Sequence, residues 1–321
     1  MNKSDSTNGQ SPFHEGELRI QERLGVKDHM DQVGKKVIRE YMPEQHRKFF
    51  AKLSYLLVGT LDESGNPWAS ILVGESGFIS TPDDRTLGVN TPLLSGDPLQ
   101  RNLADGVDIG ILGIELHTRR RNRMNGIVRN LNEEGFTIEV QQSFGNCPKY
   151  IQARQFELSD FDVTTPKPIH HLTELSDPEK QIISNGDTFF IATAYQSSSE
   201  RKASGVDVSH RGGKKGFVHI QGDRTLIVPD YIGNNFFNTF GNLEVNPRAG
   251  LLFVDFEKGD LLYLTGTAKV IWESDEIAKY EGAQRLLCFE VESGYRVEGS
   301  LPISWSEADV SPFLNFSDSE S

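Results

Sequence analysis

Two stretches of the sequence are near copies of each other, and they decide the fold class. Residues 77–89 read GFISTPDDRTLGV, and residues 216–228 read GFVHIQGDRTLIV. Seven of these 13 aligned positions are identical (Gly, Phe, Asp, Arg, Thr, Leu and Val), at an offset of 139 residues. Self-similarity at one offset is typical of a chain that repeats a structural unit.

The repeat continues beyond these two stretches. The offset becomes 140 further along and stays there, pairing Asn102-Leu103 with Asn242-Leu243, Gly110 with Gly250, Leu112 with Leu252 and Gly126 with Gly266. Chance matches would not keep one offset over such a length with a single one-residue slip. The sequence therefore predicts two tandem copies of one unit, which should superpose on each other.

Each copy contains the same order of parts. A β-hairpin precedes the repeated strand, a short helix ending in Asn-Leu follows it, and an antiparallel pair and a last strand close the copy. Six short antiparallel strands with one helix between them favour a small barrel, because closure removes exposed edges. The fold class is therefore mainly β, with peripheral helices.

These patterns divide the chain into five parts. We expect a helical extension over 1–44, a first barrel over 45–155, a loop-like linker over 156–186, a second barrel over 187–310 and a disordered tail over 311–321. Two short helices are predicted within 31–53, the second starting after Pro43, since proline suits a first helical turn. Residues 150–154 (YIQAR) are also predicted to be helical. The helical stretch 13–25 is either an arm over a barrel or a plain surface helix.

Composition excludes several classes of protein. The 33 basic and 46 acidic residues give a net charge of −13, which argues against nucleic-acid and anionic-membrane partners. The apolar stretches are too short to span a membrane. The polar first residues, MNKSDSTNGQ, lack the apolar core of a signal peptide, so a cytoplasmic protein is expected.

The residues that usually bind metals do not form a metal motif. Cys147 and Cys288 are not spaced as zinc ligands, and His170-His171 are adjacent residues in the linker. A structural or solvent-exposed role is favoured for both histidines. No metal site is predicted.

The second copy resembles the pyridoxamine 5'-phosphate oxidase-like FMN-binding split barrels. The resemblance is carried by Asn242-Leu243, then Asn-Pro-Arg-Ala at 246–249, an apolar strand, and Leu-x-Gly-x-Ala at 264–268. The stretch 143–152 (SFGNCPKYIQ) is similar to a subgroup with tandem barrels. The resemblance implies two tandem split barrels in one chain, which imitate the homodimer of simpler members, with FMN in the groove between them. The chain would then be a monomeric pseudo-dimer or form a homodimer.

The same resemblance implies which residues hold the FMN. The second-strand positions fall on Ser209, His210 and Arg211, with Lys214 and Lys215 just beyond. The third strand and the helix start fall on Asp230, Tyr231, Gly233, Asn234 and Asn238. Where the oxidases proper have an Arg-Lys pair, this chain has Asn238 and Thr239. Its contacts to the phosphate must therefore be weaker or come from other residues. The alternative for HRGGKKG (210–216) is a solvated basic turn.

The first copy lacks the basic second strand, since its aligned strand reads WASILVG. We therefore expect one FMN per chain. Arg121 and Arg123 alternate along a strand and so share a face, which either binds an anion or decorates a hairpin tip. Lys149 and Tyr150 follow an unusual turn and either reach a phosphate or flavin edge or serve only the shape of the turn.

The function expected from these features is FMN-dependent oxidation or reduction of a small molecule. Hydride transfer to a flavin needs no catalytic dyad from the protein, and none stands out here. The partner would be a small-molecule substrate or an electron donor. Two alternatives remain: a flavin-binding protein without turnover, and a haem-binding or haem-degrading split barrel with His210 as the axial ligand.

Overall fold

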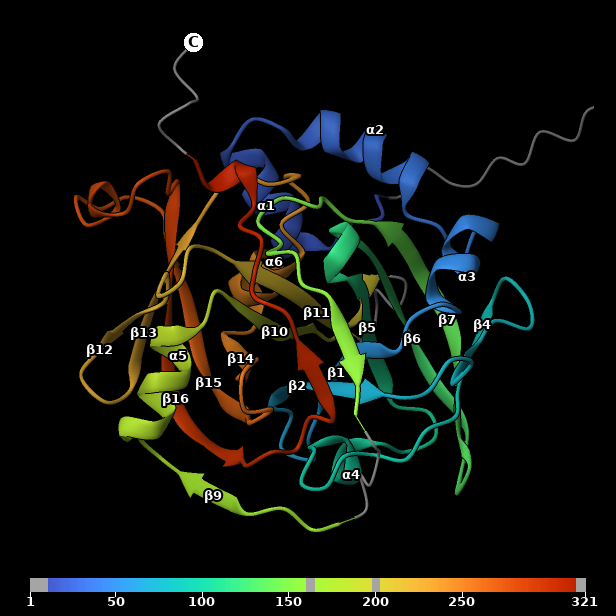
Figure 1. Cartoon of the computed structure of the whole chain (residues 1–321). Helices are drawn as coiled ribbons and strands as arrows, with labels where there is room; N and C mark the ends of the chain where they lie inside the picture. The colour runs from blue at the N-terminus through green and yellow to red at the C-terminus, as the bar shows by residue number, and fades with distance from the viewer. Residues whose placement is uncertain (1–10, 160–164, 198–202, 316–321) are drawn as a thin grey trace, which may run out of the picture.

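The computed structural model describes residues 11–159, 165–197 and 203–315, and two antiparallel sheets dominate it (Figure 1). The first sheet contains β1 (Tyr55–Leu61), β2 (Pro67–Val73), β3 (Ile79–Ser80), β4 (Thr86–Val89), β5 (Asp108–Glu115), β6 (Arg120–Asn132) and β7 (Gly135–Gly145). The second contains β10 (Thr188–Tyr195), β11 (Gly205–Gly212), β12 (His219–Gln221), β13 (Thr225–Asp230), β14 (Arg248–Val254), β15 (Leu261–Ile271) and β16 (Arg285–Val297).

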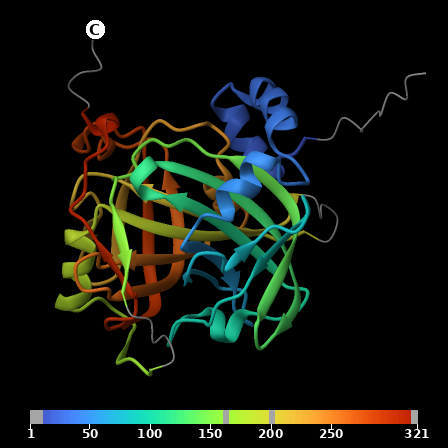
Figure 2. The ribbon, with the colours of Figure 1, turned by 45° about the vertical axis from the view of Figure 1, so that its right-hand side comes forward.

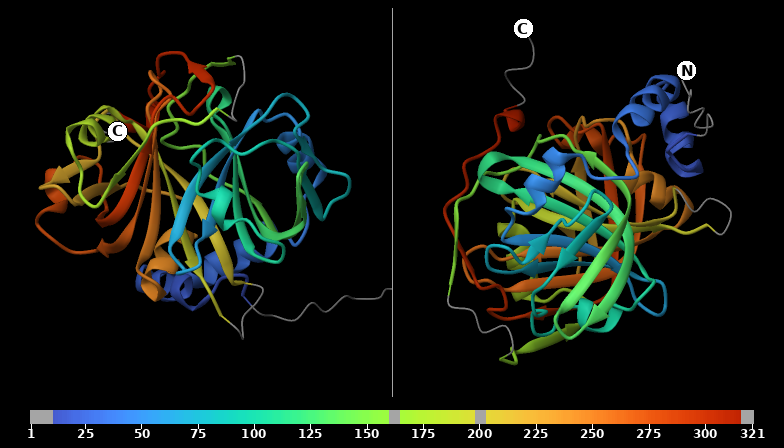
Figure 3. Two further views of the ribbon diagram at one scale, coloured as in Figure 1. Left: turned by 90° about the horizontal axis from the view of Figure 1, so that it is seen from below. Right: turned by 90° about the vertical axis from the view of Figure 1, so that its right-hand side faces the viewer.

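The two sheets have the same topology. Their strand orders are β2-β1-β5-β6-β7-β4-β3 and β11-β10-β14-β15-β16-β13-β12, which are identical position by position. Seen from below, they form two barrels lying side by side (Figure 3). The prediction of two copies of one barrel is confirmed. Each copy has seven strands rather than the predicted six, since a very short strand, β3 or β12, precedes the Asp-Arg-Thr-Leu turn.

The repeated glycine near the middle of each copy lies where the two barrels meet. A Cβ on Gly110 of β5 would lie 2.5 Å from the carbonyl oxygen of Val206 at the start of β11. A Cβ on Gly250 of β14 would lie 2.1 Å from that of Pro67 at the start of β2. Both distances are too short for any side chain, so each glycine allows the neighbouring barrel's backbone to approach. The repeat therefore encodes the pseudo-symmetric interface as well as the barrels.

Apolar side chains form three large cores. One fills the first barrel, one fills the second, and a third lies between the barrels and takes residues from both. Tyr55, Trp68 and Ile71 of the first barrel meet Phe190, Leu252 and Tyr263 of the second in this third core. The barrels are thus joined by continuous apolar packing.

Three helices precede the first barrel: α1 (Glu15–Arg23), α2 (Lys27–Val37) and α3 (Glu44–Phe50). The third starts directly after Pro43, as predicted, whereas the second starts at Lys27, ahead of the predicted 31. Helix α1 packs on α6 (Asn238–Val245) of the second barrel, and a Cβ on Gly16 would lie 2.1 Å from the carbonyl oxygen of Gly241. The stretch 13–25 is therefore an arm over the second barrel (Figure 2).

The segments around the barrels correct three expectations. The linker holds β8 (Phe156–Leu158), β9 (Ile169–Leu172) and α5 (Asp177–Asn185), so it is more regular than predicted. Residues 150–154 are not helical, because their backbone leaves the turn in extended form beside Asp309. In the predicted tail, Pro312–Leu314 forms a 3-10 turn whose Leu314 is buried, and 316–321 lie outside the described residues.

The remaining short elements are α4 (Leu99–Asn102), β17 (Ile303–Trp305) and the 3-10 turns Leu116–Thr118 and Ile277–Lys279. Within the described ranges, no helix has the length and apolar character needed to cross a membrane.

Candidate functional site

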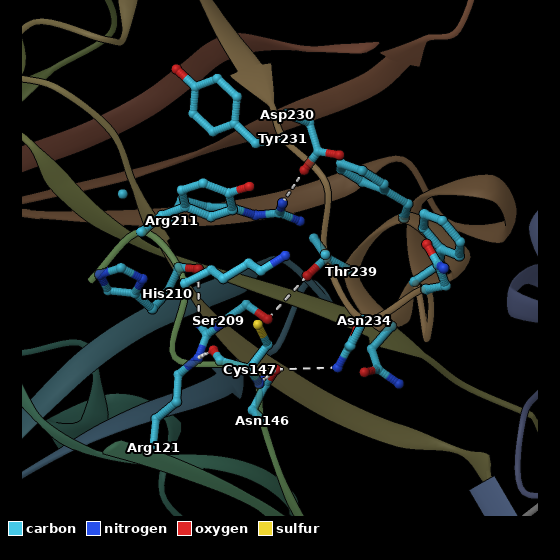
Figure 4. Close-up of a pocket in the computed structure, with 18 of the residues that line it drawn as sticks. Arg121, Asn146, Cys147, Ser209, His210, Arg211, Asp230, Tyr231, Asn234 and Thr239 are labelled. Atoms are coloured by element: carbon cyan, nitrogen blue, oxygen red, sulfur yellow. Dashed lines mark hydrogen bonds and ion pairs between the residues drawn. The ribbon is translucent and has the colours of Figure 1, made fainter. Parts of the chain in front are cut away.

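A pocket lies where the first barrel's β6 and the loop after β7 meet β11, β16 and the loop between β13 and α6 of the second barrel (Figure 4). It gathers nearly all the residues that the sequence predicted. Its lining includes Arg121, Arg123, Lys149 and Tyr150 from the first copy, and Ser209, His210, Arg211, Asp230, Tyr231, Gly233, Asn234 and Asn238 from the second. The two sets are about 90 residues apart in the sequence, and only the pseudo-dimeric packing brings them together.

Lys214 is the exception among the predicted site residues. It does not line this pocket, and its Nζ lies 3.8 Å from the carboxylate of Glu281 at an exposed position. The glycine-rich turn after Arg211 carries Lys214 away from the pocket. For this residue the solvated basic turn was the better interpretation.

Strand β11 presents Arg211 at the mouth of the second barrel. Its guanidinium donates to the carboxylate of Asp230 at the end of β13 (Figure 4). It also lies over the ring of Phe240, 4.7 Å from the centroid. Arg285 of β16 approaches the same Asp230, with 3.4 Å between Nε and Oδ2. Asp230 therefore orders two arginines at once.

Arg123 reaches the start of α6 from the other barrel. Its Nη1 donates to Asn238 Oδ1 at 2.8 Å and lies 3.0 Å from Asp207 Oδ1, and its Nη2 donates to Ser209 Oγ. The helix start has Asn238 and Thr239 where the oxidases proper have an Arg-Lys pair. The first barrel thus places a cation beside the start of α6, a helix with no basic residue of its own.

Arg121 lies in the same pocket but contacts no carboxylate among the described residues. Its Nε donates to the carbonyl oxygen of Cys147 at 2.6 Å, and its Nη1 donates to that of His210 at 3.3 Å. Burial, together with the neighbouring Arg123 and Arg211, lowers its pKa to about 9. Arg121 remains charged at neutral pH, and nothing among the described residues neutralises it.

The pocket as a whole has more cations than anions. Four arginines line it, whereas the carboxylates that pair with them are Asp207 and Asp230. Burial raises the pKa of both aspartates, and their arginine partners oppose that shift. With both aspartates ionised, the arginine cluster keeps two excess positive charges, apart from the charge of Lys149, and this excess favours an anionic ligand.

Several buried nitrogen atoms around the pocket lack a hydrogen-bond partner. They are Arg123 Nε, Arg211 Nε, Arg285 Nε, Arg285 Nη1 and His210 Nε2. Buried donors are normally satisfied, and one left unpaired costs about 1–3 kcal/mol. The four arginine nitrogen atoms among them are therefore sites for acceptor atoms of a ligand or of water.

The walls of the pocket are shaped by unusual backbone. Tyr150, Asn235 and Phe237 have φ of 65°, 61° and 62°, in the left-handed region that non-glycine residues rarely adopt. The Tyr150 ring lies 5.1 Å from that of Tyr231, and Asn234 Nδ2 donates to Asn146 Oδ1 at 3.3 Å across the gap between the barrels. Such strain is typical of functional sites held in place by surrounding contacts.

The lining residues that sequence reasoning missed include Phe217, Phe237, Phe240 and Arg285. Arg285 lies directly opposite Asp230 in the register of β13 with β16. An arginine at the start of a strand carries no local signal of this kind, so only the strand pairing could have revealed it. The aromatic residues looked like core residues, and they also form one wall of the pocket.

The tyrosines and His210 are all uncharged at neutral pH. Burial raises the pKa of Tyr150 and of Tyr231 to about 12. Burial and the nearby Arg121 and Arg211 lower the pKa of His210 well below its usual value. Neither tyrosine is a general base in this state, and the site is suited to holding an anion more than to acid–base chemistry.

Metal ligands do not gather in the described part of the chain. Among those residues there is no group of three or more His, Cys, Asp or Glu side chains that could hold a metal ion. His170 lies on β9 with its Nε2 2.9 Å from Glu298, and both side chains are largely exposed. Cys147 is a half-buried free thiol in the pocket wall.

No protein-family model matches the sequence, and no curated protein matches it. Solved structures that match include HupZ from Group A Streptococcus (18% identity over 37% of this chain and 90% of that one, TM-score 0.29). Another is HutZ, the haem storage protein from Vibrio cholerae (18% identity, 39% and 96% covered, TM-score 0.27).

A third match is a Clostridium acetobutylicum protein related to general stress protein 26, of the pyridoxinephosphate oxidase family (14% identity, 40% and 92% covered, TM-score 0.27). Each of these three matches covers no more than about two fifths of this chain.

Proposed function

We propose that this pocket binds one FMN and that the protein is an FMN-dependent oxidoreductase acting on a small molecule. The observation that carries the proposal is the uncompensated arginine cluster, above all the buried Arg121 with no carboxylate partner among the described residues. A phosphate dianion would neutralise the two excess charges and supply acceptors for the unpaired donors. Each barrel contributes part of this cluster.

The residues present fit the two halves of an FMN molecule. Arg121, Arg123 and Arg211 offer planar guanidinium donors, and the start of α6 adds backbone N–H groups beside them. Tyr150, Tyr231 and the phenylalanines next to α6 offer flat apolar surfaces of the kind that suits an aromatic ring system. When bound, FMN would supply hydride or electron transfer.

The protein's own contribution would be to bind, orient and exclude water. No described pair of side chains in the pocket forms a nucleophile with a base beside it, and the neutral tyrosines keep their protons. A flavoprotein needs neither, because the ring carries out the redox chemistry. A flavin-binding protein without turnover would need the same residues, so turnover must be tested separately.

The test begins with the visible spectrum of the purified protein and a titration of FMN into the ligand-free form. We expect flavin bands and saturable binding, followed by reduction of the bound flavin by a nicotinamide donor under anaerobic conditions. Saturable binding without reduction by any donor would favour the carrier alternative. Failure to bind FMN would refute the proposal.

One observation favours a second candidate, a haem site. His210 is buried in the pocket, its pKa is depressed so that the ring is neutral, and its Nε2 has no hydrogen-bond partner. A neutral imidazole with a free nitrogen is what haem iron binds. Haemin titration distinguishes the two: an intense Soret band that His210→Ala abolishes would support haem, and its absence would leave flavin.

A further inference from the structure

The N-terminal arm inserts a carboxyl group behind the pocket. Glu17 of α1 is buried, its Oε2 accepts from the backbone N–H of His14 at 2.9 Å, and its Oε1 accepts from Nδ2 of Asn238. The first bond completes the N-terminal cap of α1. The second bond connects the arm to Asn238, a residue of the pocket, and capping does not require it.

Asn238 connects Glu17 with Arg123. A guanidinium can only donate hydrogen bonds, so Asn238 must present its Oδ1 to Arg123 Nη1, at 2.8 Å. The Nδ2 group of Asn238 must then find an acceptor on its other side, and Glu17 provides it. Glu17 therefore sets the orientation of the Asn238 amide. Through that amide it also holds one side of the Arg123 guanidinium in place.

Glu17 faces three charged or titratable groups. His14 lies on its own arm with Nε2 3.6 Å from Glu17 Oε2, and Arg123 of β6 and Asp207 of β11 interact with it across the interface. His14 accepts from the Gly16 N–H through Nδ1 and so donates to Asn242 through Nε2. Burial lowers the pKa of His14 to about 4, which keeps the ring neutral.

Burial also decides the protonation of Glu17. It raises the pKa of this carboxyl to about 8, although the bonds from His14 and Asn238 act in the opposite direction. Glu17 is therefore mostly neutral at pH 7 and becomes charged as the pH rises through about 8. In the charged form it places a negative charge beside Arg123, which weakens the attraction of the pocket for an anion.

We propose that Glu17 is a positioning residue for the anion-binding pocket: it holds Asn238, and through Asn238 it holds the Arg123 guanidinium at the start of α6. This inference rests on the proposed function only for its ligand. The arm is then part of the site, although Glu17 itself lies behind the pocket wall.

The first experiment measures FMN affinity in full-length wild type, Glu17→Ala and Glu17→Gln at pH values of about 7 and 9.5. Glu17→Ala removes the acceptor, and we expect about two- to tenfold weaker binding at neutral pH, the value of one hydrogen bond. Glu17→Gln keeps an uncharged acceptor, so it should bind like wild type at neutral pH. Wild type should lose affinity at the higher pH, and Glu17→Gln should lose less.

Two control variants separate positioning from arm docking. Glu15→Gln removes another carboxylate from α1, an exposed one that bonds Arg19, and should leave affinity and its pH dependence unchanged. Gln21→Ala removes an arm contact to the carbonyl oxygen of Phe236, and it should leave the pH dependence as in wild type. Equal effects of Glu17→Ala and Gln21→Ala would overturn the proposal.

A ligand-free measurement keeps the inference separate from the proposed function. The Nε–Hε signal of Arg123, followed by nitrogen-15 NMR without FMN, should shift in Glu17→Ala and stay in place in Glu15→Gln. A shift in a protein that binds no FMN would retain the positioning role and reject FMN as the ligand. An unchanged signal in a folded Glu17→Ala would overturn the positioning role itself.

Discussion

The two barrels meet along two pseudo-equivalent crevices. One is lined by arginines, and the other is filled by apolar and aromatic side chains. In the first barrel Leu57 pairs with Ile71 on one side and Leu112 on the other. In the second, Phe190 pairs with His210 and Leu252 in the same way. Ile71 therefore corresponds to His210, and Leu72, the next residue, corresponds to Arg211. By the same registers, Leu261 takes the place of Arg121, and Tyr263 that of Arg123. Three of the four arginines of one crevice, together with His210, thus correspond to apolar or aromatic residues in the other.

The apolar crevice is filled by its own side chains. Tyr263 and Tyr295 lie 5.1 Å apart by ring centroids, Trp68 lies 5.7 Å from Tyr295, and the Tyr263 hydroxyl donates to the buried Asp97 at 2.9 Å. Packing of this kind stabilises the junction, at about 25 cal/mol per Å² of apolar surface buried. The arginine crevice gives up that stabilisation and stays open for a ligand.

A duplicated interface can thus serve two purposes in one chain, stability at one crevice and ligand binding at the other. Burying paired charges contributes little net stability, whereas burying apolar surface contributes much. One crevice therefore stabilises the pseudo-dimer, and the other is free to bind.

The largest expected difference between the two crevices is that one binds FMN and the other does not. Among the described residues, four arginines gather in one crevice and apolar side chains fill the other, so flavin released by denaturation should approach one FMN per chain. Quantification of the released flavin against protein, by absorbance, measures this ratio. A ratio near two would mean that the apolar crevice binds as well, and the asymmetry would be refuted.

Arg123→Ala should destabilise the ligand-free protein by about 3–5 kcal/mol, because it leaves the carboxylate of Asp207 buried without its counter-ion. Urea denaturation followed by circular dichroism measures this. The double variant Arg123→Ala/Asp207→Ala should recover part of the loss, since no unpaired charge remains. If the double variant is no more stable than the single one, the ion pair is not the cause.

Arg211→Ala should weaken FMN binding about ten- to a hundredfold, the value of one hydrogen bond to a charged group, which is about 1.5–3 kcal/mol. The fold should be retained, because Arg285 still compensates Asp230. The matched control is Leu72→Ala at the equivalent position of the first barrel. That variant should lose about 2–5 kcal/mol of stability and keep its FMN affinity. Unchanged affinity in Arg211→Ala would remove this residue from the site.

Tyr263→Phe should have the smallest effect, and its size should depend on pH. Burial raises the pKa of Asp97 to about 6, and the Tyr263 hydroxyl, which favours the charged form, opposes that shift. Below about pH 5 the carboxyl is neutral and losing the bond should cost about 1 kcal/mol. Above about pH 7 it is charged and the cost should roughly double. Denaturation at both pH values checks this, and a cost independent of pH would contradict it.

Much of the fold could be predicted because its signals are local in the sequence. The 77–89 and 216–228 repeat, with the shared glycines at 110 and 250, is visible in the letters alone and implies two similar barrels. Helix α3 was placed correctly because Pro43 is a local start signal. The helix expected at 150–154 was wrong because tertiary contacts to Asp309 hold that segment extended.

The sequence by itself determined the duplication, the net acidity, the single basic second strand and most of the residues in the pocket. Their combination depends on the tertiary structure: Arg123 supplies a cation at the start of α6, Arg285 shares Asp230 with Arg211, and Glu17 of the arm lies behind Asn238. The reason is the separation along the chain over which each kind of interaction acts. Turns, caps and alternation act between near neighbours in the chain, whereas charge pairing and burial depend on the surfaces that the two barrels and the arm bring together.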